Sequence, residues 1–400
     1  MTSDGVLLLV GTYCGLNKGD RLMQQVMIDG VLEVHPDTRV VLASPFQDVD
    51  REFYPRATVV KASRRNLPLA LLKCLLLLLP YRIRIWLARR NDEWTRYLQA
   101  DLVVDLSGDM LTEDYGVLIA ISHAIPLFYA RMLRRKYMVI AQSVGSFRWT
   151  SGLYRWLLRG AKAITVRDPI SRRYLMQMQL ANVQETSDLG FLLRPTNSAS
   201  QIVATETAEL RIGIAPSGLL LQKFSLSRNG TKSAIDEMAE MFNRLGEQFD
   251  VHFVLIPHVQ SPRGNIDDAA VCQQLAQRLS APSTQLNPEL TPAEVKSYVG
   301  GLDLLIAYRM HAALAGLDGG IPTIAISYSH KTAGLYERLG LSHWVVKNDE
   351  GFLFALEGKV RELVDRRHEV VEQLRQVLPE VRDDAKKNVD LVIAELSRGA

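Results

Sequence analysis

An arginine and a histidine two positions apart, Arg309 and His311, form the pattern in this chain with the clearest capacity for chemistry. They follow the apolar run Leu302 to Ala307, which predicts a buried strand, and precede a helical stretch of small residues. Arginine offers a planar fork for a carboxylate or phosphate, and an imidazole can transfer a proton near neutral pH. A lone histidine is more often structural, but here a strand end, a helix start and a basic neighbour coincide. The pattern predicts an anion site with a proton-transfer group beside it.

A glycine-rich segment, Gly11 to Asp20, follows the apolar run Val6 to Val10 and leads into a helical pattern. Glycines in such a place let backbone amides approach a ligand, and the next helix N-terminus favours an anion. The spacing matches neither the dinucleotide-binding nor the P-loop pattern. Asn17, Gly19 and Asp20 are the candidate residues here. A purely structural turn, with Asp20 as a helix cap, is an open alternative.

Two other predicted strands end in small or polar residues. The first is followed by Ser107, Gly108 and Asp109, and the second ends at Gln142, with Gly145 shortly after it. In open parallel sheets such residues line the ligand site beyond the carboxyl ends of the strands. A carboxylate there could orient or deprotonate a substrate hydroxyl, whereas acidic loops are more often only solvated. Both interpretations of Asp109 remain open.

A further strand end carries a charged pair, Arg167 and Asp168, before a helix that begins near Ser171. Arg167 could bind a carboxylate or phosphate through its fork of N–H groups. The structural alternative is an ion pair between Arg167 and Asp168 that only fixes the turn.

The elements that position these residues alternate between short apolar runs and helical patterns, which is typical of a parallel α/β fold. We expect two Rossmann-like domains facing a central cleft, with a C-terminal helical segment. The predicted helix starts include Ser233 with Asp236 and Thr291 with Glu294. The expected divisions are an N-terminal domain over 1–195, a linker over 196–209, a C-terminal domain over 210–375 and a helix over 376–400. The predicted strands are Val6–Val10, Arg39–Ala43, Thr58–Lys61, Leu102–Leu106, Met138–Gln142, Ala163–Val166, Arg211–Ala215, Val251–Ile256, Leu302–Ala307 and Thr323–Ile326.

Composition narrows the function classes. The net charge of +3 over 400 residues is small, which argues against a nucleic-acid binder. Three widely separated cysteines fit a reducing cytoplasm and have no zinc-like spacing, so no metal site is expected. The first ten residues carry an acidic residue and no basic region, and are therefore read as a strand rather than a signal peptide.

The segment Leu67 to Leu79 is almost wholly apolar, interrupted by Lys73 and followed by Pro80. Spanning a bilayer takes about 20 apolar residues, so this run is too short to cross one. Arginines before and after it leave two alternatives over residues 67–90. One is a buried core helix, and the other is an interfacial helix whose arginines meet anionic lipid headgroups, a peripheral contact at the inner face of the plasma membrane.

Taken in order, these motifs resemble the polysaccharide pyruvyl transferase family. The similarity runs from the turn Asn17 to Asp20, through Arg167 to Ser171, to Arg309 with His311, and on to Tyr328 and Lys331. The resemblance implies a fold similar to the two-Rossmann (GT-B) glycosyltransferases. It also implies phosphoenolpyruvate as a co-substrate, with no other cofactor, and transfer of pyruvate as a cyclic ketal to a sugar of a cell-surface glycan or its lipid-linked precursor.

The resemblance also implies roles for the residues. His311 is the expected acid, and Asp20 or Asp109 the expected base. Where the family commonly has a Gly-Gly pair after Ser107, this chain has Gly108-Asp109, so the acceptor loop is expected to differ. The expected donor-binding residues are Arg167, Arg309, His311, Tyr328 and Lys331. The expected acceptor-side or lining residues are Asn17, Gly19, Ser107, Gly108, Asp109, Gln142 and Gly145.

Two alternatives remain at this stage. One is a glycosyltransferase of the same fold, with Arg309 and Lys331 binding the diphosphate of a nucleotide sugar. The other is a catalytically silent member that binds glycan, against which the intact Arg309 and His311 argue.

Overall fold

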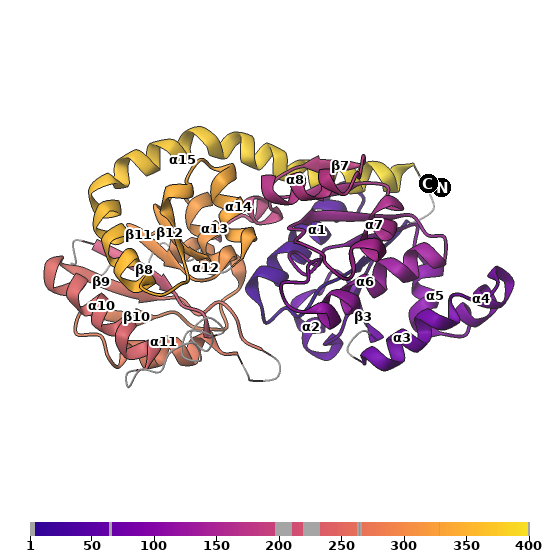
Figure 1. The fold of residues 1–400 in the computed structure, drawn as a ribbon, viewed down its shortest axis with the longest axis horizontal. Coiled ribbons are helices and arrows are strands. Elements are labelled where there is room, and N and C mark those ends of the chain that lie inside the picture. Colours follow the sequence, from indigo (N-terminus) through magenta and orange to yellow (C-terminus); the bar gives the residue numbers. More distant parts are fainter. Residues whose placement is uncertain are drawn as a thin grey trace. The chain divides into compact units, whose positions relative to one another are not determined.

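The computed structural model describes residues 5–63, 66–196, 210–218, 233–261, 264, 266–327 and 329–398. The chain separates into two compact α/β units, drawn in Figure 1. Unit 1 comprises Met1–Gly15, Asp20–Leu192 and Val381–Ala400, and unit 2 comprises Leu16–Gly19 and Leu193–Glu380. Of the expected linker over 196–209, only Thr196 is among the described residues.

Unit 1 is built on a parallel sheet with the strand order β3-β2-β1-β4-β5-β6-β7. The inner strands are buried on both faces, so they are continuous apolar runs rather than alternating ones. The order reverses between β1 and β4, where Val10 lies opposite Asp105. Such a reversal is where open parallel sheets bind ligands. The strands are β1 (Val6–Val10), β2 (Arg39–Ser44), β3 (Thr58–Lys61), β4 (Leu102–Asp105), β5 (Tyr137–Gln142), β6 (Ile164–Val166) and β7 (Val183–Glu185).

The helices of unit 1 connect successive strands of this sheet. Most bury one apolar stripe against it, as α6 does with its central residues. They are α1 (Lys18–Val34), α2 (Gln47–Phe53), α3 (Leu67–Leu76), α4 (Tyr81–Ala88), α5 (Asp92–Gln99), α6 (Val117–Met132), α7 (Ser151–Arg159) and α8 (Pro169–Gln177).

Unit 2 repeats this plan with a parallel sheet in the order β10-β9-β8-β11-β12-β13. Its order reverses between β8 and β11. The strands are β8 (Leu210–Ala215), β9 (Val251–Leu255), β10 (Ser283–Gln285), β11 (Leu304–Ala307), β12 (Thr323–Ser327) and β13 (Val345–Lys347). The helices are α10 (Ala234–Gln248), α11 (Asp268–Ala276), α12 (Pro292–Val299), α13 (Met310–Asp318), α14 (His330–Arg338) and α15 (Phe352–Ser397).

The sequence-based fold class, two Rossmann-like α/β domains with a C-terminal helical segment, is confirmed in its architecture. Both predicted capping boxes are present, from Ser233 to Asp236 and from Thr291 to Glu294. The prediction missed β7, β10 and β13. Each of these has three residues and lies at a sheet edge, so each lacks a long apolar run.

The apolar segment after β3 is not a core helix. It divides into α3 and α4 around a turn that ends at Pro80, and most of its leucines are exposed. The flanking Arg64 and Arg65 lie outside the described residues. Among the residues that are described, every helix is too short or too polar to cross a lipid bilayer.

The last helix, α15, is longer than the helix expected over 376–400, and its final part belongs to unit 1. The fully buried Asn388 anchors that part. Its side-chain oxygen accepts hydrogen bonds from Thr165 at 2.6 Å and Thr186 at 2.9 Å, and its amide donates to the Ser187 carbonyl at 2.8 Å. These bonds join α15 to the ends of β6 and β7.

Replacing this buried amide tests how strongly α15 stabilises unit 1. We expect Asn388→Ala to lower the free energy of unfolding by about 1–3 kcal/mol, because three buried polar partners lose a hydrogen bond. Urea denaturation followed by circular dichroism measures the change. The matched control is Asp390→Ala, at an exposed position of the same helix, which should stay close to wild type. Equal stability of the two variants would contradict this account.

Candidate functional site

The carboxyl edge of the sheet in unit 2 gathers the basic residues. Arg309 follows β11 and is the residue before the first turn of α13, and His311 lies in that turn. His258 follows β9 by three positions. These strand ends lie beside the reversal of strand order. Arg309 and His311, which were predicted from sequence, therefore share this edge with His258, which was not.

A buried carboxylate fixes Arg309. Asp268, at the start of α11, is fully buried and receives two hydrogen bonds from the guanidinium, Nε to Oδ2 at 3.0 Å and Nη2 to Oδ1 at 2.7 Å. The same carboxylate accepts from the backbone N–H groups of Gly218 at 3.0 Å and Val259 at 2.9 Å. Asp268 thus joins the ends of β8, β9 and β11. It also balances the charge of Arg309, whose Nη1 forms neither of these two bonds.

The segment Leu16–Gly19 is part of unit 2. Asn17 forms an antiparallel bridge with Val259, the Lys18 N–H donates to the His258 carbonyl at 3.3 Å, and Lys18 Nζ donates to the Pro288 carbonyl at 2.5 Å. Lys18 is buried. Its ammonium therefore adds a second fixed cation to this edge, a residue that sequence reasoning did not single out.

Gly19 makes room for His311. A β-carbon at Gly19 would collide with the His311 ring at Nδ1, Cγ and Cε1. The glycine is in the first turn of α1, where Asn17 Oδ1 accepts from its N–H at 3.0 Å. Glycine is therefore required at position 19 for steric reasons, because its backbone has an ordinary helical conformation.

His258 is only 4% exposed, and neither ring nitrogen has a hydrogen-bond partner among the described residues. Burial is the largest cause of a pKa of His258 well below its ordinary value. The next causes are the neighbouring positive groups, His311, Lys18 and Arg309. A neutral imidazole offers one N–H donor and one acceptor. The only sequence signal for His258 is its place just beyond an apolar strand.

Two expected donor residues, Tyr328 and Lys331, follow β12 in the sequence. Lys331 lies in the first turn of α14 and is partly exposed. Tyr328 lies outside the described residues.

The carboxyl edge of the sheet in unit 1 holds a second polar cluster, at the reversal between β1 and β4. Ser107 donates through both N–H and Oγ to Asp105 Oδ1, at 3.0 and 2.5 Å, and its Oγ lies 3.3 Å from Gln142 Oε1. Gln142 donates in turn to the Asp105 carbonyl at 3.1 Å. Gly11 has a φ of +91°, and a side chain there would strike the Ser107 backbone. Gly11 is thus explained by packing without a ligand.

Arg167 lies in this cluster of unit 1, whereas Arg309 and His311 lie in unit 2. Its Nη1 donates to Asp188 at 2.6 Å and its Nε to Ser143 at 2.8 Å. Both members of the ion pair are nearly completely buried. The structural alternative of an Arg167 pair with Asp168 is therefore wrong, because Asp168 caps α8 through the Ser171 N–H at 2.7 Å.

One donor atom of Arg167 is unused. Its Nη2 is buried without a hydrogen-bond partner among the described residues, and it lies 4.0 Å from where a β-carbon of Gly108 would be. Gly108 has a φ of +72°, which favours glycine. A ligand oxygen near Gly108 could accept from Nη2.

Three other expected residues are less central in unit 1. Asp20 lies in the first turn of α1 and is near enough to the buried Tyr54 to contribute to its raised pKa, after burial and Asp50. Asp109 accepts from the Tyr115 hydroxyl at 2.5 Å. Gly145 is buried and donates its N–H to the Leu111 carbonyl at 3.1 Å.

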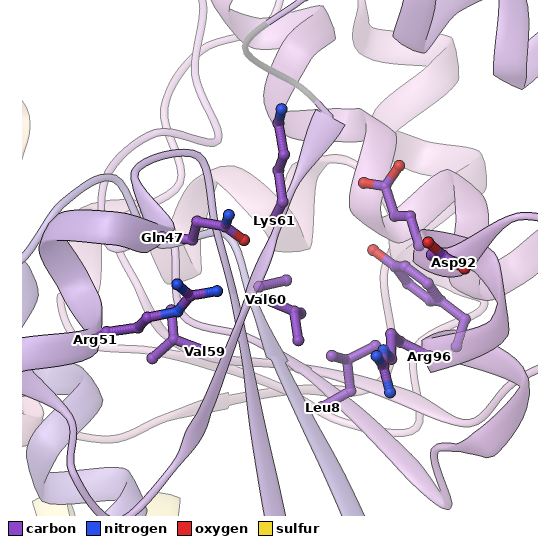
Figure 2. Close-up of a pocket in the computed structure, with 11 residues that line it drawn as sticks. Leu8, Gln47, Arg51, Val59, Val60, Lys61, Asp92 and Arg96 are labelled. Carbon is purple, nitrogen blue, oxygen red and sulfur yellow. The ribbon is translucent and has the colours of Figure 1, made fainter.

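A separate cavity of about 260 Å³ lies over the edge strand β3. Figure 2 shows its charged and polar lining, with Gln47 and Arg51 on one side of the strand and Asp92 and Arg96 on the other. It contains none of the residues predicted to do chemistry. The sequence-based site belongs to the strand ends rather than to this cavity.

Comparison with known proteins identifies the family. The sequence profile of the family "Polysaccharide pyruvyl transferase" matches residues 17–330, which is most of the chain. The chain belongs to the polysaccharide pyruvyl transferase family. The matched range includes Asn17, Arg167, Arg309 and His311, and the family suggested by the sequence is confirmed.

One relative and two solved structures place this pyruvyl transferase family member among similar proteins. The amylovoran biosynthesis protein AmsJ of Erwinia amylovora is 21% identical over 94% of this chain and 96% of its own. A putative UDP-N-acetylglucosamine 2-epimerase from Listeria monocytogenes has a TM-score of 0.61 at 12% identity, over 96% of this chain and 94% of that one. A glycosyltransferase from Rickettsia africae has a TM-score of 0.56 at 11% identity, over 100% and 97%. At these identities the two structures show a shared GT-B-like fold.

The packing of Gly19 against His311 gives a direct test in this family member. We expect Gly19→Ala to displace the imidazole and to destabilise the protein by about 1–3 kcal/mol, despite the better helix propensity of alanine. The histidine side-chain NMR signals and the melting temperature are the measurements. The control Gly358→Ala lies in α15 with open space around it and should not lower stability. An unmoved His311 signal in a stable Gly19→Ala protein would refute the close packing.

The lowered pKa of His258 predicts a pH dependence of stability. The unfolded chain binds a proton at this histidine below about pH 6.5 while the folded chain does not, so the free energy of unfolding falls as pH drops. One such histidine contributes a slope of up to about 1.4 kcal/mol per pH unit. Urea denaturation between pH 7.5 and 5.5 should show that the free energy of unfolding of His258→Gln falls less steeply with decreasing pH than that of wild type. His368→Gln, at an exposed position of α15, should keep the wild-type slope, and equal slopes in all three proteins would contradict the prediction.

Proposed function

We propose that this protein is a phosphoenolpyruvate-dependent pyruvyl transferase that places pyruvate as a cyclic ketal on a sugar. The observation that carries the proposal is the family match over residues 17–330, which includes the basic cluster of unit 2. The acceptor is a sugar of a cell-surface polysaccharide or its lipid-linked precursor, and the relative AmsJ is an amylovoran biosynthesis protein.

The donor carries a carboxylate and a phosphate, so its site needs fixed cations. In unit 2, Arg309 is held by Asp268 and Lys18 by the Pro288 carbonyl, so both are positioned before a ligand arrives. Preorganised donors stabilise developing negative charge without reorganisation. Arg309, Lys18 and Lys331 are the proposed anion-binding residues, and His258 adds a neutral N–H donor.

The reaction balances with one acid and one base. His311 protonates the methylene carbon of phosphoenolpyruvate, and the central carbon takes on oxocarbenium character. One sugar hydroxyl adds to that carbon and loses its proton to a carboxylate, for which Asp109 and Asp20 are the candidates. The carbon–oxygen bond to phosphate then breaks, a second hydroxyl adds, and its proton leaves with phosphate. The products are a ketal and inorganic phosphate.

The acceptor side is proposed to lie in unit 1. Ser107 and Gln142 form a fixed polar network, and Arg167, which the sequence predicted at the donor, has its unpartnered Nη2 near Gly108. Asp109 replaces the second glycine common in the family and is already bonded to Tyr115. A sugar hydroxyl that binds Asp109 must either displace the Tyr115 hydroxyl or bind beside it. This requirement restricts which sugars the acceptor loop can bind.

The assay combines purified protein, phosphoenolpyruvate and a panel of nitrophenyl hexosides or lipid-linked sugars. Phosphate release that depends on the sugar, together with a mass gain on that sugar, supports pyruvyl transfer. Release of a nucleoside diphosphate from a nucleotide sugar, without any reaction of phosphoenolpyruvate, would favour a glycosyltransferase instead.

Two variants test the residue roles. Arg309→Lys should lower kcat/KM for phosphoenolpyruvate by about 10²- to 10³-fold, because a point charge cannot replace the fork. His311→Asn should lower kcat by about 10²- to 10⁴-fold and remove one limb of the pH profile. The control Arg278→Lys changes an exposed arginine paired with Asp236 and should keep wild-type kinetics. Wild-type kcat/KM in a folded Arg309→Lys protein would remove Arg309 from the donor site, and an unchanged pH profile in His311→Asn would remove the acid role.

A further inference from the structure

We propose that α3 and α4 form a membrane-docking surface that lies in the headgroup region of an anionic bilayer. This inference rests on the proposed function for one point, the lipid-linked acceptor, and it adds where that acceptor is met. Docking itself can be measured without transferase activity.

The two helices expose an unusual amount of hydrocarbon. Leu75 and Leu78 are 63% and 61% exposed, and Trp86 is 54% exposed. Exposed apolar side chains gathered on one short segment mark an interaction site. The exposed large hydrophobic residues of this pair are Leu69, Leu71, Leu72, Leu75, Leu76, Leu78, Leu79, Tyr81, Ile83 and Trp86.

The helix pair is nevertheless anchored to unit 1. Ala70, Leu77 and Ala88 are fully buried, where α3 contacts α6 and α4 contacts α5. The buried Arg84 donates from Nη1 to the Leu77 carbonyl at 3.1 Å and so holds the turn between the helices. Figure 1 shows α4 at the outer edge of unit 1, beyond α5. The exposed leucines therefore belong to a folded surface, and they face away from its anchoring stripe.

The charges of this surface have one sign. Residues Leu67 to Arg90 include five basic residues and no aspartate or glutamate. Lys73 is paired with Glu93 at 2.8 Å. The exposed arginines Arg82, Arg89 and Arg90 have no carboxylate partner among the described residues. Basic charge beside exposed hydrocarbon fits a partner that is both apolar and anionic.

An anionic bilayer supplies both features, and a second copy of this chain does not. A symmetric dimer through α3 and α4 would bring like arginines together. In a bilayer, short amphipathic helices lie in the interface plane with their apolar side chains about 5–10 Å deep and their arginines at the phosphates. Trp86, with the Arg90 guanidinium 4.0 Å over its ring, is a residue type enriched at that depth.

The position of α3 connects docking to the proposed reaction. Leu67 begins α3 six positions after Lys61, the last residue of β3. All strands of this sheet are parallel, so α3 starts from the same edge as Ser107 and Gly108. A bilayer at α3 and α4 would therefore present lipid-linked sugars to the acceptor side of unit 1.

Vesicle flotation tests the apolar part. Wild type should float with vesicles of phosphatidylcholine and phosphatidylglycerol. The partition coefficient of the variant Leu72→Gln/Leu75→Gln/Leu78→Gln onto these vesicles should be at least tenfold lower. These three side chains are exposed, so circular dichroism and the melting temperature should stay near wild type. The control Phe354→Gln/Met176→Gln removes exposed apolar side chains elsewhere and should float like wild type.

The same assay tests the charges. Arg82→Gln, Arg89→Gln and Arg90→Gln should each weaken partitioning by about fivefold, the equivalent of about 1 kcal/mol per basic residue. Added salt, or vesicles of phosphatidylcholine alone, should weaken wild type in the same way. The control Arg278→Gln/Arg366→Gln/Arg375→Gln changes arginines far along the chain and should have no such effect.

Absence of wild-type flotation overturns the inference, as does equal flotation of a folded leucine variant. A wild-type dimer in sedimentation that the leucine substitutions convert to monomer, without flotation, would assign the surface to a second copy. Flotation without pyruvyl transfer leaves docking intact and refutes the proposed function. Transfer to soluble sugars without flotation refutes docking alone.

Discussion

The carboxylate of Asp268 organises the carboxyl edge of the second sheet. It has no access to solvent and accepts four hydrogen bonds, two from Arg309 and one each from the N–H groups of Gly218 and Val259. A buried charge is tolerated only when it is paired and hydrogen-bonded in this way. The donors lie in the segments that follow three strands, β8, β9 and β11. The position of Arg309 therefore depends on all three strand ends being folded.

Both units have the same sheet architecture, but the polar residues at its carboxyl edge differ. Each sheet reverses its strand order once, and a polar network lies at that reversal. In unit 1 the network joins the side chains of Ser107 and Gln142 to the carboxylate of Asp105. In unit 2 it holds two cations, Lys18 and the Asp268-paired Arg309, beside the buried His258, whose pKa is lowered.

Most of the fold was predictable from sequence, because most strands are buried and are continuous apolar runs, and ten strands were recognised. The three-residue edge strands β7, β10 and β13 carry no such signal. Arg309 and His311 were predictable because a guanidinium and an imidazole adjoin a strand end. His258 and Asp268 were not, since the burial of one and the four hydrogen bonds of the other come from long-range packing. The apolar run after Leu67 was ambiguous because hydropathy does not reveal which side is covered.

The discontinuous composition of unit 1 has a consequence for its biosynthesis. Its sheet is made early in translation, but the segment from Val381, with the buried Asn388, is made only after all of unit 2. Domains usually fold in the order in which the ribosome releases them. Here the domain that starts first must wait for α15 to complete it. Until then the side-chain hydroxyls of Thr165 and Thr186 lack the amide that joins them, and a ribosome that stalls within unit 2 leaves unit 1 without its last segment.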